Sequence, residues 1–153
     1  MAINFNPVNT DDILTALYRR LNSDSAFKGL VNSIDKSPKR VGKFKNPCAT
    51  MHVLSAPRDG ETDVVRATAT INIYVDDTDK GRANTALLGE CAERVQYLFH
   101  RADLRIHPEG VMTHENLIFG DVIAGEALFL KSQTEGEHVA SINVHMIVRR
   151  RRS

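Results

Sequence analysis

The sequence predicts an α+β fold: a largely antiparallel sheet of about four to five strands, one long helix packed on it, and a short pair of helices at the N-terminus. Three observations predict this class. Apolar residues recur at helical spacing near the N-terminus and in the middle of the chain, they alternate with polar residues elsewhere, and the alternating segments come in runs, not one for one with the helices. A chain of 153 residues has the size of one domain, so residues 1–153 are expected to form a single one.

The composition is that of an ordinary globular protein. The chain is 42% hydrophobic and 25% charged, which disfavours disorder, collagen and coiled coil. No apolar run approaches the roughly 18 residues of a membrane-spanning helix, and the N-terminus lacks the basic start and apolar stretch of a signal peptide. Two cysteines do not make a disulfide framework. The composition therefore predicts a soluble domain in a reducing, intracellular setting.

The N-terminal third predicts two helices between an arm and a basic loop. Residues 1–9 are expected to form an extended arm, because asparagine and proline interrupt their apolar residues. Thr10 is the predicted N-cap of the first helix, and the two aspartates after it suit the positive end of a helix dipole. A second, shorter helical pattern spans residues 23–34, and the basic loop spans residues 36–46. The first helix has the apolar stripe Ile13, Leu14, Leu17, Tyr18 and Leu21.

Two strands are predicted after the basic loop. Residues 49–54 alternate between apolar and polar, and a turn-rich connection over residues 56–60 follows. Residues 65–75 give the clearest strand, with an apolar face and a polar face. This pattern is typical of an antiparallel strand that buries one side. The apolar face consists of Val65, Ala67, Ala69, Ile71, Ile73 and Val75.

A long helix is predicted from about Asp79 to Arg101. Its apolar stripe is Ala83, Leu87, Cys91, Val95 and Leu98. We expect this stripe to pack on Ala67, Ala69, Ile71 and Ile73 of the preceding strand. Alanine side chains are short, so they let a helix approach the sheet closely.

The C-terminal third is predicted to be β-structure. Residues 117–123 and 127–131 form two strand-like segments, and residues 133–137 form a polar turn. The last strand, residues 140–148, alternates strongly. Two weaker strand signals lie at residues 104–106 and 111–112.

Basic residues gather in two places. Four of the 20 basic residues are Arg149, Arg150, Arg151 and Arg152, in the C-terminal tail 149–153, which leaves 16 basic against 19 acidic residues in the rest of the chain. Five more lie within ten residues that contain no acid: Lys36, Lys39, Arg40, Lys43 and Lys45. The remaining body is acidic, unlike the broadly basic surface of a dedicated nucleic-acid binder. We predict both clusters to be interface elements that hold carboxylates of identical or neighbouring subunits, with solvated segments and DNA contacts as the alternatives.

Motifs for catalysis, cofactors and metals are not found. The six histidines lie at least seven residues apart, which is wider than the pairs of common metal sites. No nucleophile elbow, phosphate-binding loop or dinucleotide fingerprint occurs. Cys91 falls on the helix stripe as a small core residue, while Cys48, at the start of a strand, could be exposed. We therefore expect no enzyme, no catalytic residues, no cofactor and no metal.

The order of these elements resembles the tail terminator, or tail completion, proteins of long-tailed bacteriophages. The similarity spans roughly residues 10–149 and is carried by layout and hydrophobic pattern. The matching segments are the first helix (residues 11–17), a second helical turn (26–31), a proline at the start of a strand (46–49), the long alternating strand (67–75) and the start of the long helix (83–88). No catalytic motif is part of the resemblance.

The resemblance implies a structural virion protein with a fold related to tail-tube proteins. In that family six copies form a ring on the head-proximal end of the tail tube, stop tube growth and join the tail to the head connector. The implied partners are further copies of the chain, the tail tube protein, the head completion protein, and double-stranded DNA that passes through an axial channel without sequence-specific binding. The implied location is the tail or neck of a virion assembled in the host cytoplasm, with no membrane partner. We expect subunits to meet through sheet edges and flanking loops.

Two other functions remain open from the sequence. A neighbouring neck or head–tail connector protein would share size, ring symmetry and fold. A basic-patch nucleic-acid-binding accessory protein would use the two basic clusters instead, and its DNA affinity would fall steeply with salt.

Overall fold

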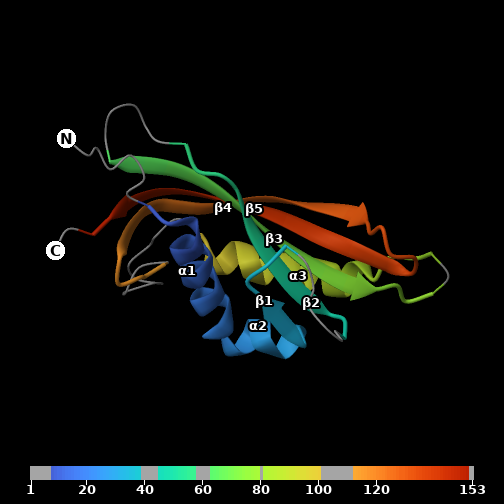
Figure 1. Ribbon diagram of the computed structural model, residues 1–153. Coiled ribbons are helices and arrows are strands. Elements are labelled where there is room, and N and C mark those ends of the chain that lie inside the picture. Colours follow the sequence, from blue (N-terminus) through green and yellow to red (C-terminus); the bar gives the residue numbers. More distant parts are fainter. Residues whose placement is uncertain (1–7, 39–44, 58–62, 80, 101–111, 152–153) are drawn as a thin grey trace.

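The computed structural model describes residues 8–38, 45–57, 63–79, 81–100 and 112–151. In this part the chain forms one five-stranded sheet, and its helices lie on one face of that sheet (Figure 1). The elements in chain order are α1 (Thr10–Asn22), α2 (Ser25–Leu30), β1 (Ser33–Asp35), β2 (Cys48–Ser55), β3 (Val64–Asp76), α3 (Thr85–Leu98), β4 (Leu117–Lys131) and β5 (Glu137–Arg150). The predicted α+β class is confirmed.

The sheet has the strand order β1-β2-β3-β5-β4 and is antiparallel except for the β1–β2 pair. The β3–β5 pair is central and continuous, from Val64 opposite Arg149 to Asp76 opposite Glu137. Strand β5 is therefore longer than residues 140–148, because its polar ends also pair with β3.

The two strand segments predicted over residues 117–131 are one strand, β4. The register of β4 against β5 shifts between Gly120 and Ile123 and again between Ala124 and Ala127. Each shift is a bulge that puts an extra residue into β4. The alternation of apolar and polar residues changes phase there, so the sequence suggests two strands where there is one. Met112 is buried but lies in no strand, and residues 104–106 are outside the described part of the chain.

Both N-terminal helices begin and end at different residues from those predicted. Asn9, not Thr10, caps α1, because its side-chain oxygen accepts the Asp11 amide at 2.9 Å. Asp24 caps α2 in the same way by accepting the Phe27 amide at 2.8 Å. Helix α2 ends at Leu30, and Ile34, predicted to be helical, lies in β1 opposite Ala49. The apolar residues of this segment have helical spacing by chance. Pairing with β2, which the spacing does not reveal, makes residues 33–35 a strand.

Helix α3 is shorter than predicted and begins at Thr85 instead of about Asp79. Gly81 adopts a left-handed φ of 71°, which interrupts a right-handed helix, and Asp79 pairs with Arg82 across the resulting turn. Asn84 then caps the helix by accepting the Leu87 amide at 3.2 Å. The helix ends at Leu98, and Arg101 lies outside the described residues.

The core lies between α3 and the sheet, as predicted, but the helix face differs by one residue. The buried side chains of α3 are Leu88, Cys91, Ala92, Val95 and Leu98. Ala83 precedes the helix and Leu87 is only partly buried, so neither lies at the centre of the interface. The expected strand face is confirmed as buried: Ala67, Ala69, Ile71 and Ile73 are each 0–1% exposed.

This packing predicts different costs for two neighbouring substitutions. Leu88→Ala should lower the free energy of unfolding by about 2–5 kcal/mol, because it leaves a cavity under α3. Leu87→Ala should cost about 1 kcal/mol or less, because that side chain is already partly in water. Denaturant melts of the two variants measure both values. Equal losses would contradict the assignment of the buried helix face.

Candidate assembly surfaces

The structure describes five of the nine cations predicted to form interfaces. These are Lys36, Lys45, Arg149, Arg150 and Arg151, whereas Lys39, Arg40, Lys43 and Arg152 lie outside the described residues. Lys36 is held within its own chain: its ammonium donates to the Thr15 hydroxyl at 2.7 Å and lies 3.2 Å from the Asp11 carboxylate. Lys45 is exposed. An interface role for these residues stays a prediction.

The C-terminal arginines continue the sheet and differ in their surroundings. Arg149 and Arg150 are the exposed last residues of β5. Arg151 is anchored, since its backbone N–H donates to the Asn116 carbonyl at 2.7 Å and its guanidinium donates to the carbonyls of His114 and Leu117 at 3.4 and 3.3 Å. All three arginines are exposed, and because Arg151 is anchored, Arg149 and Arg150 are the described cations of this segment best placed to reach a neighbour.

A polar junction joins the segment before β4 to helix α1. The Glu115 carboxylate lies 2.6 Å from the Arg19 guanidinium, which lowers the pKa of Glu115 to about 2. Beside it, buried His114 accepts the Asn116 amide at 3.0 Å and turns its other ring nitrogen toward Asp12, 3.6 Å away. The sequence offers no signal for these pairs, because about a hundred residues separate the partners.

A second ion pair ties α2 to α3. The Arg94 guanidinium donates to both carboxylate oxygens of Asp24, from Nε at 2.8 Å and from Nη2 at 2.6 Å. The same guanidinium lies 4.5 Å from the centre of the Tyr97 ring. The hydrogen bonds from Arg94 are the main cause that lowers the pKa of Asp24, although partial burial opposes them. This pair was not predicted, since Asp24 and Arg94 lie 70 residues apart.

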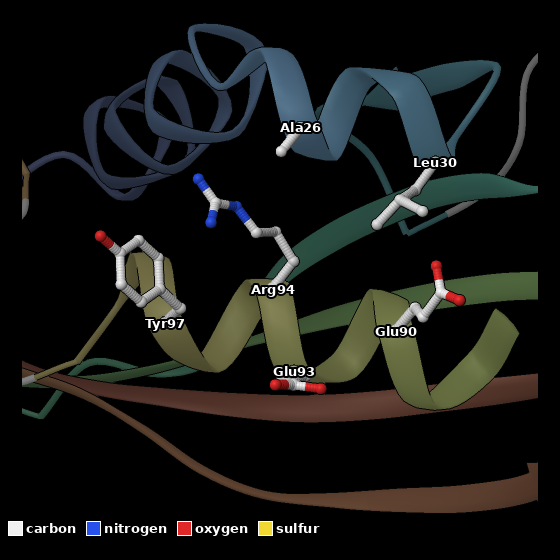
Figure 2. A pocket seen from close by; sticks show the side chains of 6 residues that line it. All are labelled: Ala26, Leu30, Glu90, Glu93, Arg94 and Tyr97. Atoms are coloured by element: carbon white, nitrogen blue, oxygen red, sulfur yellow. The ribbon is translucent and has the colours of Figure 1, made fainter. Parts of the chain in front are cut away.

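A groove of about 370 Å³ opens between α2 and α3. Figure 2 shows Ala26 and Leu30 of α2 above it, with Arg94, Tyr97 and Glu90 of α3 facing them and Glu93 at the side. Arg94 is neutralised by Asp24, whereas Glu90 and Glu93 are exposed and form no ion pair with another described residue. The groove is therefore partly apolar with a negative rim.

Strand β4 forms one edge of the sheet and carries most of the large apolar side chains that the described surface exposes. Leu128, Phe129 and Leu130 are 58, 54 and 50% exposed. They follow the second bulge and pair with β5, so the outer edge of this segment is open. We call Leu128–Leu130 the β4 apolar end. An exposed apolar edge of this kind is a natural place for a partner to bind.

On the sheet face opposite the helices, the middle of the β3–β5 ladder is largely polar. On this face Thr68 and His145 lie 3.1 Å apart, and the Thr70 hydroxyl donates to the Asn143 side-chain oxygen at 2.7 Å. Within this ladder, Arg66 and Arg149 lie at one end, and Asp76 and the buried Glu137 lie at the other. Asp121 of β4 lies beside Arg66, Thr68 and His145.

The described residues do not bring together an obvious site for chemistry. Within this part of the chain, no group of three His, Cys, Asp or Glu side chains is placed to hold a metal ion. Cys48, for which the sequence left exposure open, is buried, with its thiol 3.3 Å from the Asn46 side-chain oxygen, because β1 and β3 flank it. Burial also raises the pKa of the Cys91 thiol to about 11, so this core thiol stays protonated at neutral pH. In the described segments no helix is both long and apolar enough to cross a bilayer.

Comparison with known proteins identifies a structural relative. No protein-family model and no curated protein matches the chain. Among solved structures, a chain of the virion of a native gene transfer agent particle matches with a TM-score of 0.65 and 14% sequence identity. The match covers 90% of this chain and 95% of that chain. At this identity, the likeness establishes a shared fold over nearly the full length of both chains.

The Asp24–Arg94 pair generates a pH-dependent prediction. Asp24→Ala should cost about 1–3 kcal/mol, because it removes both the cap of α2 and a largely buried ion pair. Asp24→Asn should cost less, since asparagine can still cap the helix. Folding lowers the pKa of Asp24 below its ordinary 3.8, so its stabilisation is complete above that pH and is lost as pH falls through the lowered value.

The measurement is the free energy of unfolding from pH 2 to pH 7. Wild type should lose more stability below about pH 4 than Asp24→Asn does. Parallel curves for the two proteins would show that the ion pair contributes nothing.

Proposed function

We propose that the chain is a structural virion protein of a phage-like particle and acts as its tail terminator. The observation that carries the proposal is the fold shared over 90% of this chain with a chain of a gene transfer agent virion. The order of helices and strands that resembles tail terminators supports the same role. In this proposal several copies, six by analogy with the family, form a ring at the head-proximal end of the tail tube.

Two surfaces support a ring with a channel. The β4 apolar end gives each subunit an exposed contact for another copy or for the tail tube. The polar face of the sheet is suited to line a conduit, because along β3 and β5 its middle consists mainly of hydroxyl, imidazole and amide side chains that present few charges to DNA phosphates. DNA then passes without sequence-specific contacts, while the ring docks the head completion protein.

The location of the subunit tests this function directly. In particles labelled with an antibody against the chain, electron microscopy should find label at the head–tail junction. Particles made without the chain should have tails of irregular length that are not joined to heads. A tail tube of normal length and normal joining without the subunit would overturn the terminator role. Label on isolated heads, and not on tails, would favour the neck-connector alternative.

The exposed C-terminal arginines generate a separate prediction. Arg149→Ser with Arg150→Ser should weaken joining at moderate salt, because two exposed cations that can hold carboxylates are removed while the anchored Arg151 is kept. Each exposed pair contributes about 0.2–1 kcal/mol and is screened by salt, so the difference between wild type and the variant should shrink as ionic strength rises. Counts of joined particles across a salt series measure it.

The same variant discriminates the nucleic-acid alternative. Normal joining with a reduced slope of DNA affinity against salt would mean that these arginines contact phosphate and would favour a DNA-binding accessory protein.

A further inference from the structure

We propose that the groove between α2 and α3 of one copy receives the β4 apolar end of a second copy, with Lys131 of that second copy beside Glu90 and Glu93. This inference deepens the proposed function, because it names the contact through which copies of the chain join.

The two surfaces match in character. The groove offers Leu30, Ala26 and Tyr97 as apolar contacts, and its two charges that form no ion pair with another described residue are both negative. The β4 apolar end offers three large side chains, each at least half exposed. Phe129 lies on the same face of the strand as the exposed cation Lys131, and Leu128 and Leu130 lie on the other face. An apolar end flanked by one positive charge fits an apolar groove rimmed by two negative charges.

The size of the groove indicates what kind of occupant it takes. A volume of about 370 Å³ is near the low end of ordinary binding pockets and accommodates one or two large side chains. A whole helix or strand needs more room. Side chains projecting from the edge of a neighbouring sheet therefore suit it better than an inserted segment.

A single chain cannot make this contact with itself. Glu90, Arg94 and Tyr97 lie on the flank of α3 that faces α2 (Figure 2). Strand β4 lies along the other flank, where the Gln96 amide donates to the Gly125 carbonyl at 3.1 Å. The two surfaces are thus separated by the helix, and a contact between them must join two copies.

The geometry of this contact also suits a ring. Patch and groove are different parts of the surface, so the contact is head-to-tail and each copy keeps one unused surface for the next copy. Such contacts close into rings when the rotation between copies allows it. A symmetric β4-to-β4 contact would instead stop at a dimer.

Cysteine cross-linking between two single variants tests the contact. Tyr97→Cys and Phe129→Cys are coexpressed, assembled into particles and oxidised, and the disulfide-linked dimers are identified by mass spectrometry. We expect dimers that contain one copy of each variant, and none from either variant alone. Both native cysteines are buried, so they give little background.

Exchanging the charges of Lys131 and of Glu90 and Glu93 provides a second test. Lys131→Glu should lower the yield of mixed dimers about threefold to tenfold, and Glu90→Lys with Glu93→Lys in the partner should restore it. Arg82→Glu, which reverses an exposed cation in the turn before α3, is the matched control and should leave the yield unchanged.

Three results would overturn the inference: dimers of Phe129→Cys alone, which indicate paired β4 edges; no mixed dimers; or no rescue by the charge exchange. The proposed function has its own test in the antibody labelling. Label at the junction without mixed dimers would support the terminator role and overturn this contact. Mixed dimers without label at the junction would support the contact and overturn the terminator role.

Discussion

The continuous pairing of β3 with β5 is the constraint on which the rest of the structure depends. Because no bulge interrupts this ladder, its two faces stay distinct over its whole length. One face presents the buried alanines Ala67 and Ala69, whose short side chains leave room for α3. The other face carries hydroxyl, imidazole and amide side chains that hydrogen-bond across the two strands. A shift by one residue would exchange the two faces and expose the core.

Because helix α3 packs on this ladder, the ladder also fixes how α3 is oriented toward α2. Its buried side rests on the sheet, so its remaining flanks are fixed in direction, one toward β4 and one toward α2. On the α2 flank, Arg94 holds Asp24 with two hydrogen bonds, and Asp24 also caps α2. The groove lies beside this pair. Because Asp24 neutralises Arg94, the charges of Glu90 and Glu93 at its rim have no counter-ion among the described residues.

How much could be predicted follows from the range of each interaction. Apolar residues recur every two residues in the strand over residues 65–75 and every three to four residues in the helices, so the local sequence predicts these elements. The start of α3 was misplaced because the turn around Gly81 imitates a helix N-terminus in composition. The bulges of β4, the Asp24–Arg94 pair and the groove depend on residues far apart in the chain. The basic clusters were visible in sequence, but the anchoring of Lys36 and Arg151 was not.

The separation of surfaces has a consequence for assembly. The β4 apolar end lies at a sheet edge and the groove lies in the helical layer, so copies joined through them need not cover the β3–β5 part of the polar face. That part carries the exposed Arg66 and Arg149 at one end and the exposed Asp76 at the other, where Glu137 is buried. In a closed ring of equivalent copies, each exposed charge would repeat around the axis. A channel lined by this face would then differ in charge between its two ends, and these ends would present different surfaces to the proteins docked there.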